Sequence, residues 1–189
     1  MKNISVFLIV FLLCCTSCKT SKPVAAVKPS VTQKESPDRI TSEVDFSDPA
    51  IWILGDFTLD KLLQPPYSNW YIPGYSDYTI KPDALDKLKA IGEANITIKI
   101  VMGSWCPDSR REVPRFMRVL NAIDFPTDKV QLIGVDRDKN SPVDNYGSLN
   151  IQRVPTFIIY KNNIETGRII ETPATSLEQD MVNILTRNE

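Results

Sequence analysis

Apolar residues gather in three short runs in the second half of the chain, at 96–102, 130–135 and 157–160. Runs of this length between polar segments predict strands, and the first two are apolar enough to be covered on both faces of a sheet. Around the first strand, apolar residues recur at helical spacing over 82–91 and 107–123, and each segment begins near a proline. Because proline fits the first turn of a helix, the pattern predicts two helices that alternate with the strands.

The carboxyl-terminal part of the chain has the pattern of a hairpin followed by a helix. The pair Asn162-Asn163 predicts a tight turn between the third strand and a partner at 164–170. Thr175 and Glu178 have capping-box spacing, which predicts the start of the last helix. Strands that alternate with helices and end in a hairpin predict an α/β fold, with helices flanking a central mixed β-sheet.

Ahead of this pattern lies a segment, residues 44–75, that we expect to form an N-terminal extension packed on a domain of residues 76–189. Thr58 predicts the cap of a short helix within the extension. Residues 78–80 are predicted to form a short strand at the start of the domain. Aromatic residues are concentrated between 67 and 78. We expect them to fill a groove on the domain, although they could instead form a substrate-contacting surface.

The first residues, 1–17, have the pattern of a bacterial lipoprotein signal peptide. Lys2 supplies a positive charge, and 4–13 is an apolar run too short for a membrane-spanning helix, which needs about 20 residues. The segment Cys15-Thr16-Ser17-Cys18 resembles a lipoprotein cleavage box, in which Cys18 becomes the lipidated first residue of the mature chain. An ordinary secretory signal with incidental cysteines is the alternative interpretation.

Residues 18–43 contain three prolines and few large apolar side chains. Such a segment cannot bury enough surface to order itself, so we expect a flexible tether. The lipid and the tether together would place the folded domain in the cell envelope, facing the periplasm and anchored to a membrane.

Composition excludes several kinds of site. The chain carries 22 Lys+Arg and 23 Asp+Glu, and therefore has no basic excess to suggest a nucleic-acid partner. It contains no histidine, which excludes histidine acid–base catalysis, Cys–His nucleophile pairs and histidine metal ligands. Cleavage before Cys18 and lipidation of that residue would leave Cys106 as the one free thiol, so that neither an intramolecular disulfide nor a thiolate zinc site could form. We expect no metal and no bound cofactor.

Cys106 lies at the predicted turn between the strand 96–102 and the helix that begins at Pro107. Free N–H groups and the dipole at a helix N-terminus favour a thiolate, and we expect the thiol to be exposed there rather than buried as a small hydrophobic residue. The spacing is similar to the C-x-x-C redox motif, but Ser109 replaces the second cysteine. Ser109 could still donate a hydrogen bond to the Cys106 thiolate.

Charged residues surround this thiol in the sequence. Asp108 would oppose formation of the thiolate, whereas Arg110 and Arg111 would favour it. The arginines could alternatively bind an anionic ligand at the helix N-terminus, and a solvated, well-capped helix start is the simplest interpretation of all three.

Three motifs together resemble the thioredoxin-fold family over residues 76–189. They are Trp105-Cys106-Pro107 between strand and helix, Val135-Asp136 at the end of the next strand, and Val154-Pro155-Thr156 before the hairpin. A proline within the active-site helix, Pro114, is a further trait of the family. With the amino-terminal pattern, the chain resembles membrane-anchored periplasmic thioredoxin-like lipoproteins with a monothiol C-x-x-S motif.

The resemblance implies a role for each matching residue. It implies a thioredoxin fold in which Cys106 is the nucleophile and a cis Pro155 lies opposite it. Five residues would form the substrate-binding surface: Trp105, Pro107, Val154, Pro155 and Thr156. The chain departs from the family at Ile100 and Leu132, which stand where a buried acid and its lysine partner are usual.

The sequence supports two main functional hypotheses, while a third, a peroxide-reducing enzyme, has an available thiol in Cys106 but lacks a recognisable peroxidatic context. In the first, the chain is a thiol–disulfide oxidoreductase or isomerase whose Cys106 forms mixed disulfides with exported protein or peptide thiols and needs an external thiol reductant. In the second, it is a non-catalytic thioredoxin-fold module that binds a peptide or partner, because the resolving cysteine and the buried acid are missing.

Overall fold

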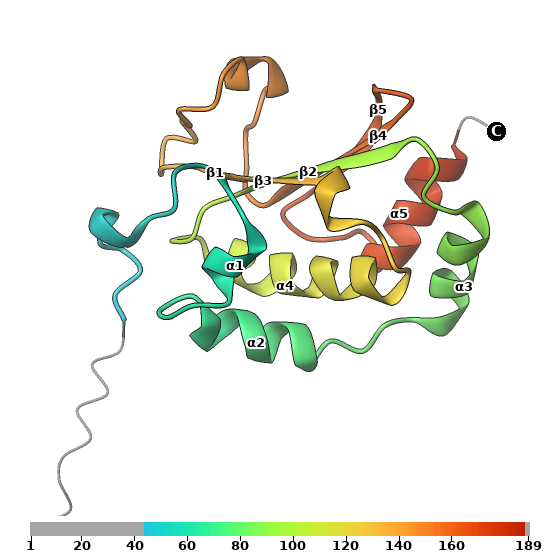
Figure 1. The fold of residues 1–189 in the computed structure, drawn as a ribbon, viewed down its shortest axis with the longest axis horizontal. Coiled ribbons are helices and arrows are strands. Elements are labelled where there is room, and N and C mark those ends of the chain that lie inside the picture. The colour runs from blue at the N-terminus through green and yellow to red at the C-terminus, as the bar shows by residue number, and fades with distance from the viewer. Residues whose placement is uncertain (1–43, 188–189) are drawn as a thin grey trace, which may run out of the picture. The chain divides into compact units, whose positions relative to one another are not determined.

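The structure is a computed structural model that describes residues 44–187. The predicted signal peptide 1–17, the lipidated Cys18 and the tether 18–43 lie outside these residues, and they stay predictions. The described part contains one mixed five-stranded sheet with helices packed on it, as predicted (Figure 1).

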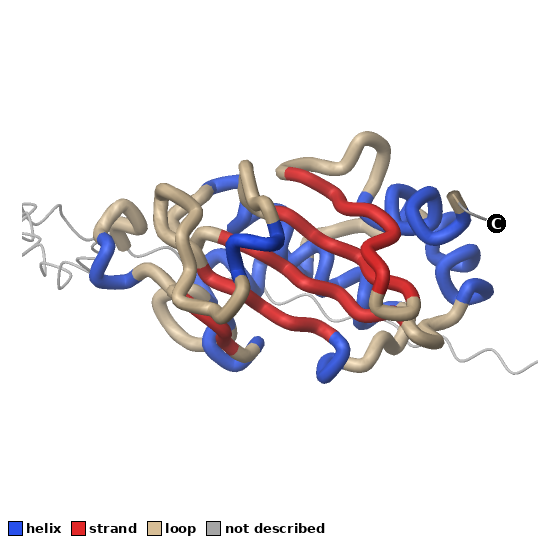
Figure 2. Tube along the Cα trace, turned by 90° about the horizontal axis from the view of Figure 1, so that it is seen from above, coloured by secondary structure: helices blue, strands red, loops and turns tan. Residues whose placement is uncertain are grey.

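The sheet has the strand order β1-β3-β2-β4-β5, seen from above in Figure 2. Strand β2 runs parallel to β3, and the other neighbouring strands are antiparallel. The strands are β1 (Gly55–Phe57), β2 (Ile96–Met102), β3 (Val130–Gly134), β4 (Thr156–Lys161) and β5 (Ile164–Ile170). The turn between β4 and β5 has positive φ at Asn162 and Asn163, as the asparagine pair predicted.

Five helices accompany the sheet, with 3₁₀ turns at Pro49–Ile51, Thr127–Lys129 and Tyr146–Leu149. The helices are α1 (Leu59–Leu62), α2 (Ser68–Ser76), α3 (Pro82–Ile91), α4 (Pro107–Ala122) and α5 (Leu177–Thr186). Helix α4 lies between the sheet and α2, while α3 packs on α5 (Figure 1). Prolines occupy the first position of α3 and α4, which explains why the predicted and observed starts coincide.

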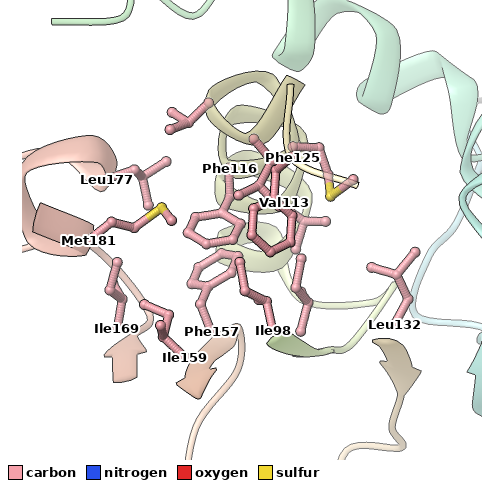
Figure 3. Close-up of a cluster of buried hydrophobic side chains, with 14 of the residues drawn as sticks. Ile98, Val113, Phe116, Phe125, Leu132, Phe157, Ile159, Ile169, Leu177 and Met181 are labelled. Carbon is pink, nitrogen blue, oxygen red and sulfur yellow. The ribbon is translucent and has the colours of Figure 1, made fainter. Parts of the chain in front are cut away.

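The main core lies between the sheet and α4. Strand β2 alternates, so that Ile98 and Ile100 face α4 together with the neighbouring Phe157 of β4. The ring of Phe157 stacks on Phe116 of α4 with 4.3 Å between the centroids (Figure 3). Side chains of α5 close the same core, including Leu177 and Met181. A smaller cluster occupies the opposite face of the sheet, beside the loop 136–155.

The extension enters the sheet, which the sequence pattern did not predict. Strand β1 pairs antiparallel with β3, with Gly55 opposite Gly134. The strand predicted at 78–80 is wrong, because these residues make no sheet pairing and the Tyr78 hydroxyl donates to Glu178 of α5. The aromatic segment forms α2, whose Tyr71 is buried against the core.

The predicted cap of the last helix is off by one residue. Ser176 is the N-cap of α5, and its hydroxyl accepts a hydrogen bond from the backbone N–H of Gln179. Thr175 instead donates its hydroxyl to Asp180. Glu178 does not close a capping box, because it accepts hydrogen bonds from Tyr78 and from a backbone N–H across the helix interface.

Candidate functional site

Cys106 is the N-cap of α4, directly after the turn that follows β2. Its backbone is extended (φ −82°, ψ 123°), its N–H donates to Gly103 O at 2.9 Å, and its carbonyl accepts from Arg110 N at 3.0 Å. Pro107 begins the helix. The strand-to-helix turn therefore holds Cys106 at the N-terminus of a long buried helix, as its sequence predicted.

The thiol is covered, and the prediction that it is exposed is wrong. Cys106 is 7% exposed and packs in the apolar cluster on the second face of the sheet with Val101, Ile133 and Val154. The Cys106 S–H donates to the carbonyl of Val154 at 3.3 Å. This contact covers the sulfur. The sequence did not predict it, because Val154 lies in a loop 48 residues away and no local pattern relates the two residues.

The Val154–Pro155 peptide bond is cis, as the resemblance implied, and it lies beside the thiol. The carbonyl of Val154 is occupied by Cys106, and the carbonyl of Pro155 accepts from Glu171 N at 2.7 Å. The site is thus formed by the end of β2, the start of α4 and the loop that enters β4.

The other residues expected to bind substrate differ in exposure. Pro107 is exposed at the first position of α4, and Trp105 is half-buried. Thr156 is buried, and its hydroxyl donates to the carbonyl of Arg153 at 2.6 Å. Pro107 and Trp105 are therefore accessible to a ligand, whereas Thr156 shapes the loop from within.

Ser109 does not contact the thiol in the way the sequence suggested. Its side chain is fully buried, and its hydroxyl accepts a hydrogen bond from Gly103 N at 3.2 Å. Among the hydrogen bonds of residues 44–187, none joins Ser109 to Cys106. Ser109 therefore links the turn that precedes Cys106 to the first turn of α4 by a hydrogen bond.

Two sheet positions where the family usually has charged residues are apolar in this chain. Ile100 and Leu132 are register partners on β2 and β3, and both are buried. The buried acid and lysine that are usual in the family are therefore replaced by a hydrophobic contact. The nearest buried carboxylate on α4, Glu112, forms ion pairs with Arg111 and Arg115.

The arginines on α4 have different surroundings. Arg111 is paired with Asp108 at 2.7 Å, which offsets the charge of that aspartate. Arg110 turns back over the site, and its Nη1 donates to the carbonyls of Ser104 and Trp105 at 3.4 Å. Burial lowers the pKa of the Arg110 guanidinium, and its interaction with Cys106 acts in the opposite direction.

The extension forms one wall of the site, which the sequence pattern did not predict. The indole rings of Trp52 and Trp105 lie 6.2 Å apart, and the Ile53 N–H donates to the buried Ser104 hydroxyl at 3.1 Å. Trp105 is held in turn by a hydrogen bond from its Nε1 to Val135 O at 2.9 Å. The aromatic content of residues 46–52 was visible in the sequence, but their position depends on the pairing of β1 with β3.

Residues 44–187 contain no group of three or more histidine, cysteine, aspartate or glutamate side chains placed to hold a metal ion. Within the same residues, no helix combines the length and the apolar character needed to cross a bilayer.

A protein family and a solved structure are similar to this chain. No curated protein matches the chain at a significant level. One similar solved structure, described as a protein of unknown function from Pseudomonas aeruginosa, is 12% identical with a TM-score of 0.48; the match covers 70% of this chain and 90% of the other. A family model described as thioredoxin matches residues 70–184, which is more than half of the sequence, and the chain therefore belongs to the thioredoxin family.

Proposed function

We propose that this chain exchanges thiols and disulfides through a single reactive thiol, Cys106. The Cys106 thiolate attacks a disulfide of an exported protein or peptide, so that one substrate sulfur joins Cys106 in a mixed disulfide and the other leaves as a thiolate. An external thiol then attacks the substrate sulfur, and Cys106 leaves as a thiolate. Each step replaces one disulfide bond by another, so the bonds and electrons balance without a second protein cysteine.

The observation that carries this proposal is the position of Cys106. The residue caps a long helix and its sulfur lies 3.3 Å from the carbonyl that precedes the cis Pro155. The helix N-terminus stabilises negative charge on sulfur. An extended substrate segment can lie along the loop at Val154 and present its own sulfur there.

A substrate must displace the present hydrogen bond of the thiol. The S–H donates to Val154 O, and an anionic sulfur has no proton for that contact. Opening of the loop 136–155, or replacement of its contact by a substrate strand, would free the sulfur for attack. Exchange should therefore depend on access as well as on the thiolate.

The test is the pH dependence of iodoacetamide alkylation at Cys106 in the full chain. Trypsin releases Ile100–Arg110, in which Cys106 is the one cysteine, so mass spectrometry reads this thiol separately from the cysteines near the amino terminus. The same chain unfolded in urea is the control, since an ordinary cysteine titrates near ~8.5. Faster alkylation of the folded chain below that pH supports exchange, and slower alkylation at every pH refutes it.

The burial of Cys106 favours a second candidate function, a binding module without redox chemistry. A 7% exposed thiol, together with the apolar pair Ile100 and Leu132 where the family usually has a buried acid and its lysine partner, fits a thioredoxin fold without the groups for proton transfer. The Cys106→Ser variant separates the two functions. Loss of disulfide-linked partners on non-reducing gels supports exchange, whereas partners retained by Cys106→Ser without any covalent link support the binding module.

The cellular location is part of the proposal. A lipid on Cys18 and a tether of residues 18–43 would hold the domain on the periplasmic side of a membrane, among exported proteins. Incorporation of labelled palmitate into the wild-type chain and not into Cys18→Ala is the expected result. Equal labelling of both chains, or of neither, would contradict lipidation at this residue.

A further inference from the structure

Two arginines near Cys106 lack an acidic partner. Within residues 44–187, Arg110 and Arg137 have no carboxylate at ion-pair distance. Four other arginines of residues 44–187 are paired, namely Arg111, Arg115, Arg153 and Arg168, whereas Arg118 and Arg187 also have no carboxylate at ion-pair distance but are not among the residues described around Cys106. A guanidinium has five N–H donors, and Arg110 uses only Nη1 in the contacts described above, so both groups retain donors for a ligand.

Aromatic rings hold these two guanidiniums in place. The guanidinium carbon of Arg110 lies 4.6 Å from the ring centroid of Phe46. That of Arg137 lies 5.7 Å from the centroid of Trp52 and 5.9 Å from that of Trp105. Cation–π contacts position a guanidinium without neutralising its charge, and its edge stays available for hydrogen bonds.

The guanidinium groups of Arg110 and Arg137 both lie close to Cys106 or to its neighbour Trp105. Arg110 lies one helical turn after Cys106 on α4, and the two groups interact electrostatically. Arg137 rests on Trp105, which directly precedes Cys106 and packs against the same apolar cluster. An anionic group bound by these arginines would lie beside Trp105, the residue that directly precedes the reacting cysteine.

We propose that Arg110 and Arg137 form a subsite for a carboxylate that the substrate carries close to its reacting sulfur. This inference rests on the exchange function proposed above and names its substrate class, which is thiols and disulfides with an adjacent negative charge. The planar fork of a guanidinium matches the two oxygens of a carboxylate. Carboxylates occur beside sulfur in acidic peptide segments and in small carboxylate-bearing thiols, and both sources share this chemistry.

Two acidic residues near these arginines are already engaged. Asp108 is paired with Arg111. The Asp45 carboxylate accepts a hydrogen bond from Ser47 N at 2.8 Å. The hydrogen bonds from Ser47 lower the pKa of Asp45, and the charge of Arg137 acts in the same direction. Asp45 is therefore an internal anion that competes for Arg137.

A pair of alkylating reagents tests the subsite. Iodoacetate and iodoacetamide transfer groups of similar size to a thiolate, but only iodoacetate brings a carboxylate. The ratio of their rates at Cys106, divided by the same ratio for the chain unfolded in urea, measures the preference for negative charge independently of the thiolate fraction. We expect the folded chain to favour iodoacetate about two- to five-fold, the effect of one unit charge at close range through a largely aqueous medium.

Single substitutions show which charged residues cause the preference for iodoacetate. Arg137→Gln and Arg110→Gln should each lower the iodoacetate rate more than the iodoacetamide rate, and Asp45→Asn should raise the preference. Lys87→Gln removes one positive charge from the exposed face of α3 and should leave the preference unchanged. The preference should also fall as salt rises from about 0.01 M to 1 M, because the Debye length shortens from about 30 Å to about 3 Å.

The outcomes separate this inference from the function on which it rests. If neither reagent modifies Cys106, the exchange function and the subsite both fail. If both reagents modify it without charge preference, or if the arginine variants slow both reagents equally, the subsite alone is refuted and the arginines only hold the extension in place.

Mixed disulfides then identify the source of the carboxylate. A small carboxylate-bearing disulfide is compared with its amide, and a cysteine peptide with flanking aspartate is compared with its asparagine form. Preference for both acids supports recognition of the carboxylate itself, and preference for the acidic peptide alone supports acidic protein segments as the substrate. Equal rates within both pairs overturn the proposal.

Discussion

Replacing Gly134 by alanine should detach the extension from the sheet. A Cβ atom at this position would lie 2.2 Å from the carbonyl oxygen of Ile53, well inside the 3.0 Å limit that real Cβ contacts respect. The added Cβ and the Ile53 carbonyl are both fixed to the backbone, so that no side-chain rotation can relieve the clash. Residue 53 would have to move by about 1 Å, a shift comparable to those that overpacked cores undergo.

The cost of that movement can be worked out from the contacts that it breaks. The Ile53 N–H would lose its bond to the buried Ser104 hydroxyl, and an unsatisfied buried group costs about 1–3 kcal/mol. Disturbed pairing of Gly55 with position 134 and the residual clash add a further strain of about 1–3 kcal/mol. We therefore expect Gly134→Ala to lower the free energy of unfolding by about 2–6 kcal/mol.

Urea unfolding of the full chain measures this loss, and Gly147→Ala is the matched control. A Cβ at Gly147 meets no atom within 4 Å, so this variant should be neutral or gain up to about 1 kcal/mol. Gly134→Ala should also raise the iodoacetamide rate at Cys106, because the wall formed by Trp52 would move away. A Gly134→Ala chain within about 0.5 kcal/mol of the parent would refute the docking of the extension.

Further changes test single contacts, each followed by urea unfolding. Ser109→Ala leaves the buried Gly103 N–H without its acceptor and should cost about 1–3 kcal/mol. Tyr78→Phe removes a donor from the fully buried Glu178 carboxylate and should cost about 1.5–3 kcal/mol; an unchanged midpoint would refute the importance of that bond. Burial raises the pKa of Tyr146 from 10.0 to about 12. Its contribution to stability is therefore complete below pH about 10 and is lost as the pH rises to about 12, and Tyr146→Phe should reduce this alkaline loss.

The elements that the sequence predicted well are those whose pattern is local. Strand β2 is a continuous apolar run between polar residues, and its observed bounds equal the predicted ones. Helices α3 and α4 begin at prolines that mark their first turn. Strand β1 has only three residues and no pattern of its own, since its place is set by pairing with β3 across the fold.

In the candidate site too, the features set by local sequence were predicted and those set by long-range contacts were not. The turn that presents Cys106 and the cis Pro155 followed from short motifs. The sequence did not predict that Val154 covers the thiol. It also did not predict that Trp52, which precedes the residues matched by the family model, forms a wall of the site. Both depend on long-range contacts that a single sequence does not show.

The contact between Trp52 and Trp105 gives the molecule an optical signal at its site. The chain has three tryptophans, and these two lie with their centroids 6.2 Å apart, at a distance where neighbouring indoles couple electronically. Near-ultraviolet circular dichroism and intrinsic fluorescence should therefore change when the extension moves or a ligand enters beside Cys106. Occupancy of the site can then be followed without a dye, a label or a known substrate.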